Sequence, residues 1–216
     1  MERIICVLIG YAFGLFQTGY IYGKAHNIDI RSQGSGNAGT TNALRTLGWK
    51  AGVATLLGDA FKCVFAVLTV QAIYRNSRGD ILPLLSMYAG MGAVLGHNYP
   101  FYLGFKGGKG IAATAGLLLS TTPWWMVLIC LFVFVGLVAA TKYVSVGSLV
   151  VVIVYLIEIV YLGQSGTFGM EANYLYETYA IAAFLMILAF YKHRANIGRL
   201  LNGTENKLSI GKANKK

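Results

Sequence analysis

Three polar segments of this sequence carry side chains that could bind phosphate and transfer a proton. The densest spans residues 96–114, GHNYPFYLGFKGGKGIAAT, in which two lysines and several glycines precede an apolar run. Glycine leaves backbone N–H groups uncovered, and the N-terminus of a helix favours an anion. We therefore expect the Lys109 ammonium to bind a phosphate together with nearby amides, those of Gly107, Gly108 and Gly110. The alternative is a flexible turn between two membrane helices.

The segment 31–42, RSQGSGNAGTTN, is a second candidate for a phosphate-binding loop. Four small residues in a row could form a backbone cradle there, namely Gly34, Ser35, Gly36 and Asn37. The Ser35 hydroxyl could contact a bound oxyanion, and a helix capped by residues 40–42 could carry Arg45 inward. The alternative is an ordinary capped turn without a ligand.

The third polar segment spans residues 193–205, HRANIGRLLNGTE. If it forms a helix that continues from the preceding apolar run, His193 and Asn196 lie on one face, three positions apart. A histidine in this place could take or relay a proton near neutral pH. The alternative is a basic flank that rests at the membrane interface.

The composition of the chain indicates a membrane protein. Hydrophobic residues make up 56% of the 216 residues and charged residues only 12%, against about 25% charged in a typical soluble domain. Several apolar runs approach the ~20 residues with which a helix crosses a bilayer. We predict one all-α polytopic domain over residues 1–216, with the lipid bilayer as a partner and no nucleic acid partner despite the net charge of +10.

The apolar stretch 111–140 decides the predicted topology, in which the first span covers residues 4–23. Because proline ends or kinks a helix, the stretch breaks near Pro123, which gives seven hydrophobic helices rather than six. Segment 111–122 then rises only about 18 Å and forms a partial helix. With the N-terminus outside and the C-terminus cytoplasmic, fourteen Lys and Arg residues lie inside and three outside, in agreement with the positive-inside rule. The three polar segments and a basic tail at about 206–216 then share the cytoplasmic face.

Ionisable residues also lie within the predicted spans or at their ends. Asp59 and Lys62 are three positions apart, so they share a helix face and are expected to form a structural pair or to support the site. His97 lies where a helix meets the glycine loop, and we expect it to fix that loop by donating a hydrogen bond. The three cysteines lie singly in apolar runs, which favours packing over disulfides or metal binding.

Taken together, the polar segments resemble the motifs of the bacterial membrane acyltransferases that acylate glycerol 3-phosphate with acyl phosphate. The stretches GSGNAGTTN, GHNYPFYLGFKGGKGIAAT and HRANIGRLLNGTE look like the first, second and third motifs of that family. The stretch YVSVGS at 143–148 is similar to a shorter family segment. The resemblance implies that Ser145 and Ser148 contact the substrate or its phosphate and that Glu205 supports the site.

The resemblance also implies the reaction. A fatty acyl group would pass from acyl phosphate to the sn-1 hydroxyl of glycerol 3-phosphate, giving lysophosphatidic acid and phosphate in bacterial phospholipid synthesis. The enzyme would lie in the bacterial inner membrane with its active site at the cytoplasmic face, and it would need no cofactor, no metal and no coenzyme A donor. Both substrates carry a phosphate, and three cations lie near the two glycine loops, namely Arg45, Lys106 and Lys109.

The chemistry of the donor shapes the predicted mechanism. Acyl phosphate is a mixed anhydride with a good leaving group, so catalysis needs mainly positioning and charge stabilisation. Lys109 would hold one phosphate, while Arg45 and Ser35 would hold the other substrate or the developing oxyanion. His193 and Asn196 would orient or deprotonate the attacking hydroxyl, although a substrate phosphate could serve as the base instead. A covalent acyl-Ser35 intermediate has no adjacent base in the sequence, so direct transfer is favoured.

Two other classes of protein fit parts of this pattern. A transporter or channel for a phosphorylated anion would use broken helices and glycine loops with cations, but it would normally show inverted repeats, and none is visible. A structural membrane-assembly protein would not need Ser35, Arg45, Lys109 and His193 on one face. The sequence predicts neither an acyl-chain preference nor an oligomeric state.

Overall fold

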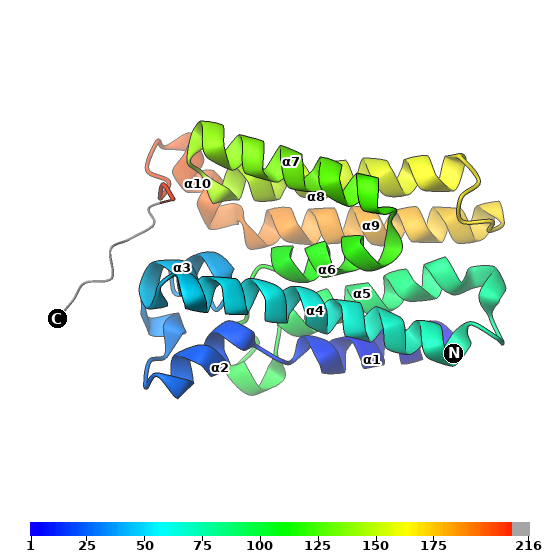
Figure 1. Ribbon diagram of the computed structural model, residues 1–216, viewed down its shortest axis with the longest axis horizontal. Helices are drawn as coiled ribbons and strands as arrows, with labels where there is room; N and C mark the ends of the chain where they lie inside the picture. Colours follow the sequence, from blue (N-terminus) through cyan, green and yellow to red (C-terminus); the bar gives the residue numbers. More distant parts are fainter. Residues whose placement is uncertain (209–216) are drawn as a thin grey trace.

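The computed structural model describes residues 1–208 as a bundle of helices that run along one long axis (Figure 1). Residues 209–216, which make up most of the predicted basic tail 206–216, lie outside the described residues. Within residues 1–208 there is no strand. The α-helices are α1 (Glu2–Gly14), α2 (Thr18–Ala25), α3 (Thr40–Leu47), α4 (Trp49–Tyr74), α5 (Leu82–Asn98), α6 (Ile111–Thr121), α7 (Trp124–Thr141), α8 (Val144–Gln164), α9 (Ala172–Lys192) and α10 (Arg194–Leu201). Three short 3₁₀ turns join them, namely η1 (Ile30–Ser32), η2 (Gly79–Ile81) and η3 (Phe101–Leu103).

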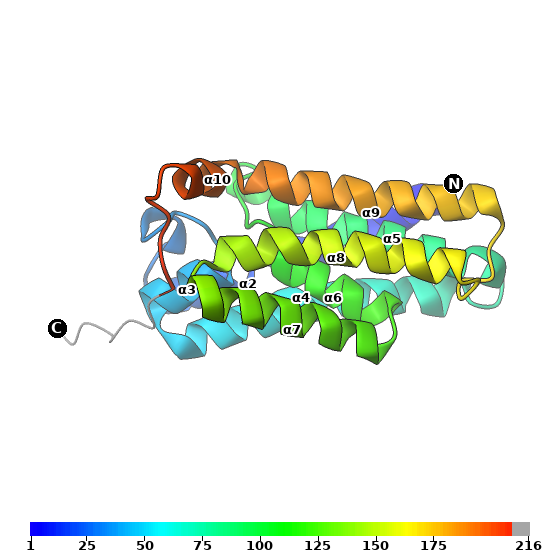
Figure 2. The same cartoon turned by 90° about the horizontal axis from the view of Figure 1, so that it is seen from above.

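The helices form two layers with α6 between them (Figure 1). One layer is built from α1, α4 and α5, with α2 and α3 at one end, and the other consists of α7, α8 and α9 side by side (Figure 2). The layers meet where α5 packs against α9 and where α6 packs against α7 and α8. Helices α3 and α10 lie at the same end of the bundle, opposite the N-terminus (Figure 1). The first and last polar segments of the sequence are therefore brought to one end.

Closely packed glycines hold α1 against α5. Each helix carries two glycines four residues apart, Gly10 and Gly14 in α1 and Gly92 and Gly96 in α5. A Cβ atom on Gly10 would lie 1.9 Å from the Ala89 carbonyl oxygen, and one on Gly96 would lie 2.3 Å from the Tyr11 carbonyl oxygen. Small residues at this spacing let two helix backbones approach closely in a membrane. The C-terminal end of α5, which leads into the glycine loop, is thus fixed to α1.

In the described part of the chain, residues 1–208, six helical segments are long and apolar enough to cross a membrane. They are Glu2–Ala25, Trp49–Tyr74, Gly79–Leu103, Trp124–Thr141, Val144–Gln164 and Ala172–Lys192. The chain breaks at Pro123 as predicted, because α6 ends at Thr121 and α7 begins at Trp124. Helix α6 has only 11 residues, the partial length that the sequence predicts for it. The count of seven helices and the orientation of the termini stay predictions.

The first span, predicted over 4–23, is present as Glu2–Ala25 and is interrupted near its middle. Helix α1 ends at Gly14 and α2 begins at Thr18, and the side chain of Gln17 fills the break. Its Nε2 atom donates to three carbonyl oxygens, those of Gly14 (3.1 Å), Gly96 (3.3 Å) and His97 (3.2 Å). Backbone groups freed inside a membrane must find partners within the protein. A single buried polar residue thus stabilises an interruption that the apolar pattern does not reveal.

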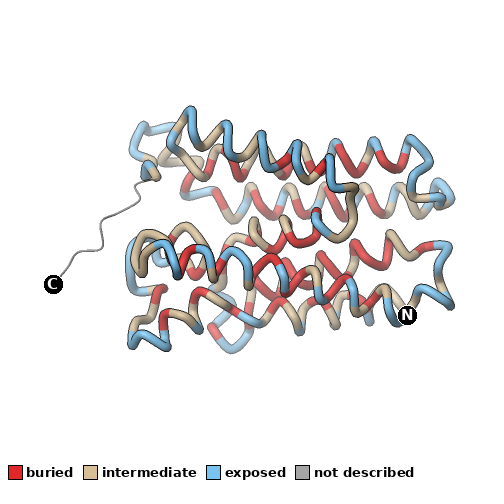
Figure 3. The backbone as a smooth tube through the Cα atoms, in the orientation of Figure 1, coloured by how far each residue is buried: buried red, intermediate tan, exposed pale blue. Residues whose placement is uncertain are grey.

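Buried residues concentrate where α1, α4, α5 and α6 face one another (Figure 3). The outer helix α7 buries only Met126 and Cys130. Large apolar side chains on its outer face stay exposed, with Trp124 at 74% and Phe132 at 81%. Exposed apolar faces of this kind match a lipid environment, so the polar groups buried inside the bundle are the exceptions that call for an explanation.

Candidate active site

The glycine loop is anchored to the end of α5 through its own backbone. The Gly107 amide donates to the Asn98 carbonyl oxygen at 3.3 Å, and the Gly108 amide donates to the His97 carbonyl oxygen at 3.1 Å. The prediction that these two amides are free to bind phosphate is therefore wrong. Gly110 has a φ of +87° and is the N-cap of α6, so it turns the chain into the helix. The loop uses these glycines for close packing, so a contact to a ligand is left to the one side chain that lies between Gly108 and Gly110.

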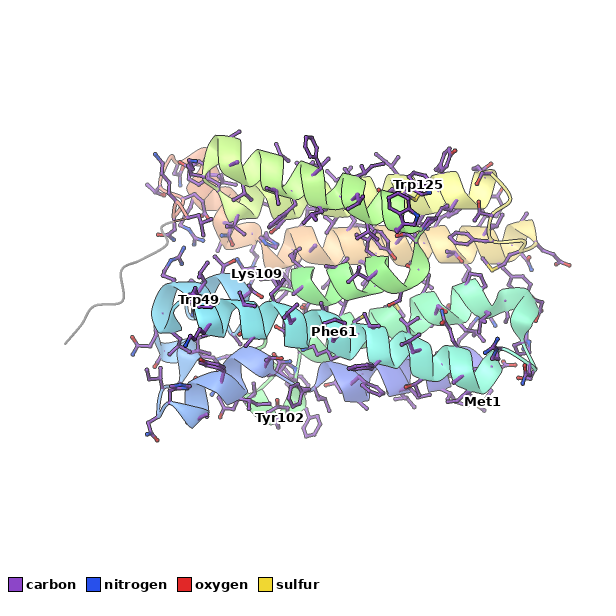
Figure 4. All side chains as sticks on the ribbon, viewed as in Figure 1. Met1, Trp49, Phe61, Tyr102, Lys109 and Trp125 are labelled. Carbon is purple, nitrogen blue, oxygen red and sulfur yellow. The ribbon has the colours of Figure 1, made fainter. Side chains whose placement is uncertain are left out.

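That side chain is Lys109, which Figure 4 places near the start of α6, between α4 and α9. Its Nζ atom donates to Asn196 Oδ1 at 2.5 Å. Burial lowers the pKa of Lys109 to about 8, although the Glu205 carboxylate opposes this shift. Three further cations push the pKa in the same direction as burial, namely Arg199, Arg45 and Lys192. A bound anion would therefore stabilise the charged form of Lys109 in these surroundings.

The first polar segment is organised by the buried side chain of Asn42. Its Oδ1 atom accepts from the Ser35 amide at 2.9 Å, and its Nδ2 atom donates to three carbonyl oxygens, those of Ile30, Gln33 and Asn37. The Gly36 amide donates to the Gln33 carbonyl oxygen at 2.9 Å. Two amides of the predicted cradle over residues 34–37, those of Ser35 and Gly36, therefore already have partners within the loop, and phosphate binding by this segment stays a prediction. The amide group of Asn42 gives the loop its shape.

The side chains of this segment face outward from that internal framework. Ser35 is exposed, and its hydroxyl has no hydrogen-bond partner among residues 1–208. Helix α3 begins at Thr40 with Gly39 as its N-cap, so residues 40–42 form the first turn rather than the predicted cap. Arg45 lies half-buried in the last turn of α3, close enough to Lys109 to lower its pKa. The segment thus offers a free hydroxyl and a guanidinium.

The third segment begins with a break that the sequence does not predict. Helix α9 ends at Lys192, α10 begins at Arg194, and His193 lies between them. His193 is only 3% exposed, and its Nδ1 atom lies 2.8 Å from the Ala189 carbonyl oxygen, so Nδ1 carries the proton and Nε2 the lone pair. Burial and then the Lys109 charge lower the pKa of His193 to about 4. The ring is neutral at physiological pH.

Glu205 joins two of the predicted site residues, Asn196 and Ser145, with Arg199 in one network. Its Oε1 atom accepts from Asn196 Nδ2 at 2.7 Å and from Ser145 Oγ at 3.1 Å, and its Oε2 atom accepts from Arg199 Nε at 2.7 Å. Burial would raise the pKa of Glu205, but the hydrogen bonds from Asn196 and Arg199 hold it below its ordinary value. The network turns the Asn196 oxygen toward Lys109. Ser145 therefore contacts Glu205, and Ser148 donates to the Val144 carbonyl oxygen of its own helix at 2.9 Å.

A polar cavity of about 310 Å³ lies where the three segments meet. Its lining comprises Gly34, Ser35, Gly36, Asn37, Lys109, Lys192, Ala195, Asn196, Arg199 and Asn206. Sequence reasoning assigned no role to Lys192, Arg199, Ala195 or Asn206. The sequence did contain a signal for the two cations, because Lys192 directly precedes His193 and Arg199 lies within the third polar segment. Lys106, predicted to be a nearby cation, is instead exposed and does not line the cavity.

The charged residues predicted to support the site form a buried cluster behind the glycine loop. Asp59 and Lys62 pair at 2.9 Å, which confirms that they interact. Lys62 Nζ also lies 2.8 Å from His97 Nδ1. The prediction that the His97 side chain donates to the loop is wrong, because its ring contacts Lys62 and its carbonyl oxygen accepts from Gly108. The cluster thus contacts the loop at Gly108, one residue before Lys109, which lines the cavity.

The arrangement can bind anionic groups through cations that come from separate elements. Lys109 lies in the glycine loop, Lys192 in α9 and Arg199 in α10. Among residues 1–208, the Glu205 carboxylate, bound to Arg199, is the only one that offsets their charge directly. Since charges in a partly buried site interact more strongly than in water, such a cavity favours phosphate groups. Beside them lies the unpartnered hydroxyl of Ser35.

Comparison with known proteins gives the same family from sequence and from structure. The sequence profile described as glycerol-3-phosphate acyltransferase matches residues 4–203. The chain is 45% identical to the glycerol-3-phosphate acyltransferase of Clostridioides difficile (strain 630) over 95% of both chains, and 41% identical to that of Halalkalibacterium halodurans over 94% of both. Its fold is similar to the crystal structure of PlsY (YgiH), an integral membrane glycerol 3-phosphate acyltransferase, in the glycerol 3-phosphate form. The TM-score is 0.81 at 30% identity, covering 97% of this chain and 96% of that one. The lysophosphatidic acid form of the same enzyme matches with a TM-score of 0.78.

Proposed function

Because this chain belongs to the glycerol-3-phosphate acyltransferase family, we propose that it transfers a fatty acyl group from acyl phosphate to the sn-1 hydroxyl of glycerol 3-phosphate. The chain is an enzyme that acylates glycerol 3-phosphate. We propose, in addition, the identity of the acyl donor, the position of the hydroxyl that is acylated and the roles of the individual residues. The products are then lysophosphatidic acid and inorganic phosphate.

One observation carries this proposal, namely a cavity whose lining combines three cations from three separate elements with a serine hydroxyl. Lys109, Lys192 and Arg199 line it together with Ser35. Glycerol 3-phosphate and acyl phosphate each bring a phosphate, so a site for both must offset several negative charges. A donor that carried its acyl group on a neutral thioester would need fewer cations at the reacting end. The charge of the cavity therefore favours a phosphorylated donor.

We assign the binding roles by where each side chain lies. Lys109 and Arg199 hold one phosphate, with the Asn196 amide as a further donor once its oxygen releases Lys109. Ser35 contacts the second substrate or the oxyanion that forms on the acyl carbon, and Arg45, which is near Lys109 but does not line the cavity, adds positive charge there. The amides of Gly107 and Gly108 take no part, because the backbone of α5 already accepts their hydrogen bonds. Ser148 takes no direct part, because its hydroxyl proton is bound within α8.

The transfer is one substitution at the acyl carbon. The sn-1 hydroxyl oxygen of glycerol 3-phosphate forms the new bond, the bond from the acyl carbon to the phosphate oxygen breaks, and the phosphate leaves with the electron pair. The hydroxyl proton goes to a phosphate oxygen. A histidine with a pKa of about 4 is a weak base, and His193 does not line the cavity, so we favour the substrate phosphate over His193 as the base.

Direct transfer is also favoured over an acyl-enzyme. A serine nucleophile needs a base within hydrogen-bond reach. The Ser35 hydroxyl has no such partner among residues 1–208. Ser35 is therefore assigned to binding. The acyl tail of the donor lies in the bilayer of the bacterial inner membrane, while its phosphate meets the water-soluble acceptor in the cavity at the cytoplasmic face.

The test uses purified protein in detergent with palmitoyl phosphate and glycerol 3-phosphate. Phosphate release and lysophosphatidic acid are followed together, with Lys109→Ala beside the wild type and palmitoyl-coenzyme A as an alternative donor. We expect equal amounts of both products from the wild type, loss of turnover in Lys109→Ala and no turnover with the thioester. Efficient use of the thioester would refute the proposed donor, and acylation at the sn-2 hydroxyl would refute the proposed position. Activity in detergent also excludes a transporter, which needs a sealed membrane.

A further inference from the structure

The buried cluster behind the glycine loop has a defined hydrogen-bond direction. Lys62 Nζ donates to three acceptors, namely Phe16 O at 2.6 Å, Asp59 Oδ1 at 2.9 Å and His97 Nδ1 at 2.8 Å. An ammonium group has three donors and no acceptor, so this lysine is fully used and His97 Nδ1 must be the acceptor. The neutral His97 ring therefore carries its proton on Nε2. Lys62 thus selects one tautomer and one orientation of the imidazole.

His97 holds Gly108 from two sides. Its carbonyl oxygen accepts the Gly108 amide at 3.1 Å, and its ring lies directly against the Gly108 Cα. A Cβ atom on Gly108 would lie only 2.0 Å from His97 Nε2. Both residues are buried, and Gly108 is followed at once by Lys109. The position of the imidazole thus determines where the chain enters Lys109.

The residue after Lys109 is fixed as well. Gly110 caps α6 with a φ of +87°, and a Cβ on it would lie 2.8 Å from Asn98 Oδ1. Lys109 is therefore held between two anchored glycines, and its side chain leaves the backbone in one direction. We propose that His97, oriented by the Asp59–Lys62 pair, is a positioning residue that places the Lys109 ammonium in the cavity. This inference rests on the proposed function, in which Lys109 binds a substrate phosphate.

The free-energy cost of burying the charges of Asp59 and Lys62 supports a role for this cluster beyond packing. Asp59 and Lys62 are 1% and 4% exposed within an apolar bundle. Apolar side chains of similar volume would join α4 to α5 without the desolvation of two charges, and such replacements are often neutral or stabilising. A hydrogen bond to one ring nitrogen, in contrast, fixes a direction, which an apolar contact does not. Ionisable residues in membrane segments commonly serve function for this reason.

The test replaces His97 by asparagine, whose side-chain oxygen lies where Nδ1 does. His97→Asn keeps an acceptor for Lys62, so the buried charge stays satisfied, but it removes the ring that touches Gly108. The readout is the pH midpoint of Lys109 acetylation by acetic anhydride, measured by mass spectrometry of its peptide. The charged and titratable groups that face Lys109 are unchanged in this variant, namely Arg45, Lys192, His193, Arg199 and Glu205. A displaced Lys109 gains water, so its midpoint is expected to rise toward the ~10.4 of an ordinary lysine.

The activity readout and a matched control complete the design. In His97→Asn we expect kcat/KM for glycerol 3-phosphate to fall by roughly 10- to 100-fold, since a 1 Å misplacement of a binding group can cost that much. The control is Gln71→Ala, which removes a hydrogen bond from α4 to Ser86 of α5 at 3.2 Å, far from the loop. It should leave the Lys109 midpoint and kcat/KM unchanged.

Two results would overturn the positioning role. One is an unchanged Lys109 midpoint in His97→Asn, and the other is an equal shift in Gln71→Ala, which would indicate general loosening of the two helices. The labelling does not depend on the donor. If the wild type fails to turn over palmitoyl phosphate, the proposed donor is wrong, and the two midpoints still decide whether His97 positions Lys109.

Discussion

Replacing Gly108 by alanine should inactivate the enzyme out of proportion to its effect on the fold. The added Cβ would lie 2.0 Å from Nε2, 2.7 Å from Cε1 and 3.0 Å from Cδ2 of the His97 ring, whereas ordinary contact begins at 3.4 Å. The ring cannot rotate away without losing its hydrogen bond from Lys62. The loop must therefore move, at an overpacking cost of about 1–3 kcal/mol.

The displacement of the loop at Gly108 is transmitted to the cavity through the next residue, Lys109. A contact that lengthens from 2.0 Å to 3.4 Å shifts the chain by more than the tolerance of the Lys109–Asn196 hydrogen bond, which is 2.5 Å long. We expect kcat/KM for glycerol 3-phosphate to fall ~100-fold, the size of effect that a misplacement of about 1 Å produces. Initial rates of phosphate release at varied glycerol 3-phosphate give this value, and thermal unfolding in detergent gives the change in stability.

Gly198 provides a matched control within the same site. It lies in α10 between Asn196 and Arg199, and a Cβ on it would meet nothing within 4 Å. Gly198→Ala should keep wild-type activity and stabilise the helix slightly, by about 0.5–1 kcal/mol. If Gly108→Ala retains activity within about twofold of the wild type, which is less than 0.5 kcal/mol in the barrier, the coupling from His97 to Lys109 is wrong.

Three further predictions concern the charges and the first loop. The pKa of Lys109 is about 8 and only its charged ammonium form binds phosphate, so kcat/KM should fall as the pH rises through 8. Lys109→Arg should remove this alkaline limb of the pH profile of kcat/KM, because arginine stays charged. The Glu205 carboxylate raises the pKa of Lys109, so Glu205→Gln should move the same limb to lower pH; a limb that stays in place would refute the assignment. Asn42→Ala leaves the Ser35 amide and the Asn37 carbonyl group without partners among residues 1–208 and removes one donor each from the carbonyl groups of Ile30 and Gln33, so it should lower stability by about 1–3 kcal/mol and abolish turnover, whereas an active, stable variant would show that the loop is shaped by other contacts.

The helices and their main interruption follow from patterns that act locally. Runs of apolar residues specify spans, and Pro123 ends a helix wherever it stands, so α6 and α7 were predictable as separate elements. The break between α1 and α2 was not predictable in this way. It depends on Gln17 reaching carbonyl groups of α5, which are distant in the sequence. An interruption stabilised by tertiary contacts leaves no local signal.

The difference between local patterns and tertiary contacts also explains which features of the site could be predicted from the sequence. The residue types at Lys109 and Ser35 indicate binding of an anion because their chemistry belongs to the side chains, and the structure brings both to one cavity. Whether a backbone amide is free depends on its neighbours in space, so the use of the Gly108 amide by His97 was beyond sequence reasoning. The positions of Asn196 and Arg199 in the lining depend in turn on the break at His193, because both residues lie in α10.

The two-layer architecture has a mechanical consequence. The cavity takes Ser35 and Lys109 from the first layer and its connections, and Asn196 and Arg199 from the segment that follows the second layer. The layers touch mainly along α5 with α9 and around the short α6 (Figure 2). Any force that tilts one layer against the other changes the spacing between the cations. A bilayer whose thickness does not match the helices exerts such a force on them, so the affinity of this enzyme for its substrates should change with the thickness of the membrane.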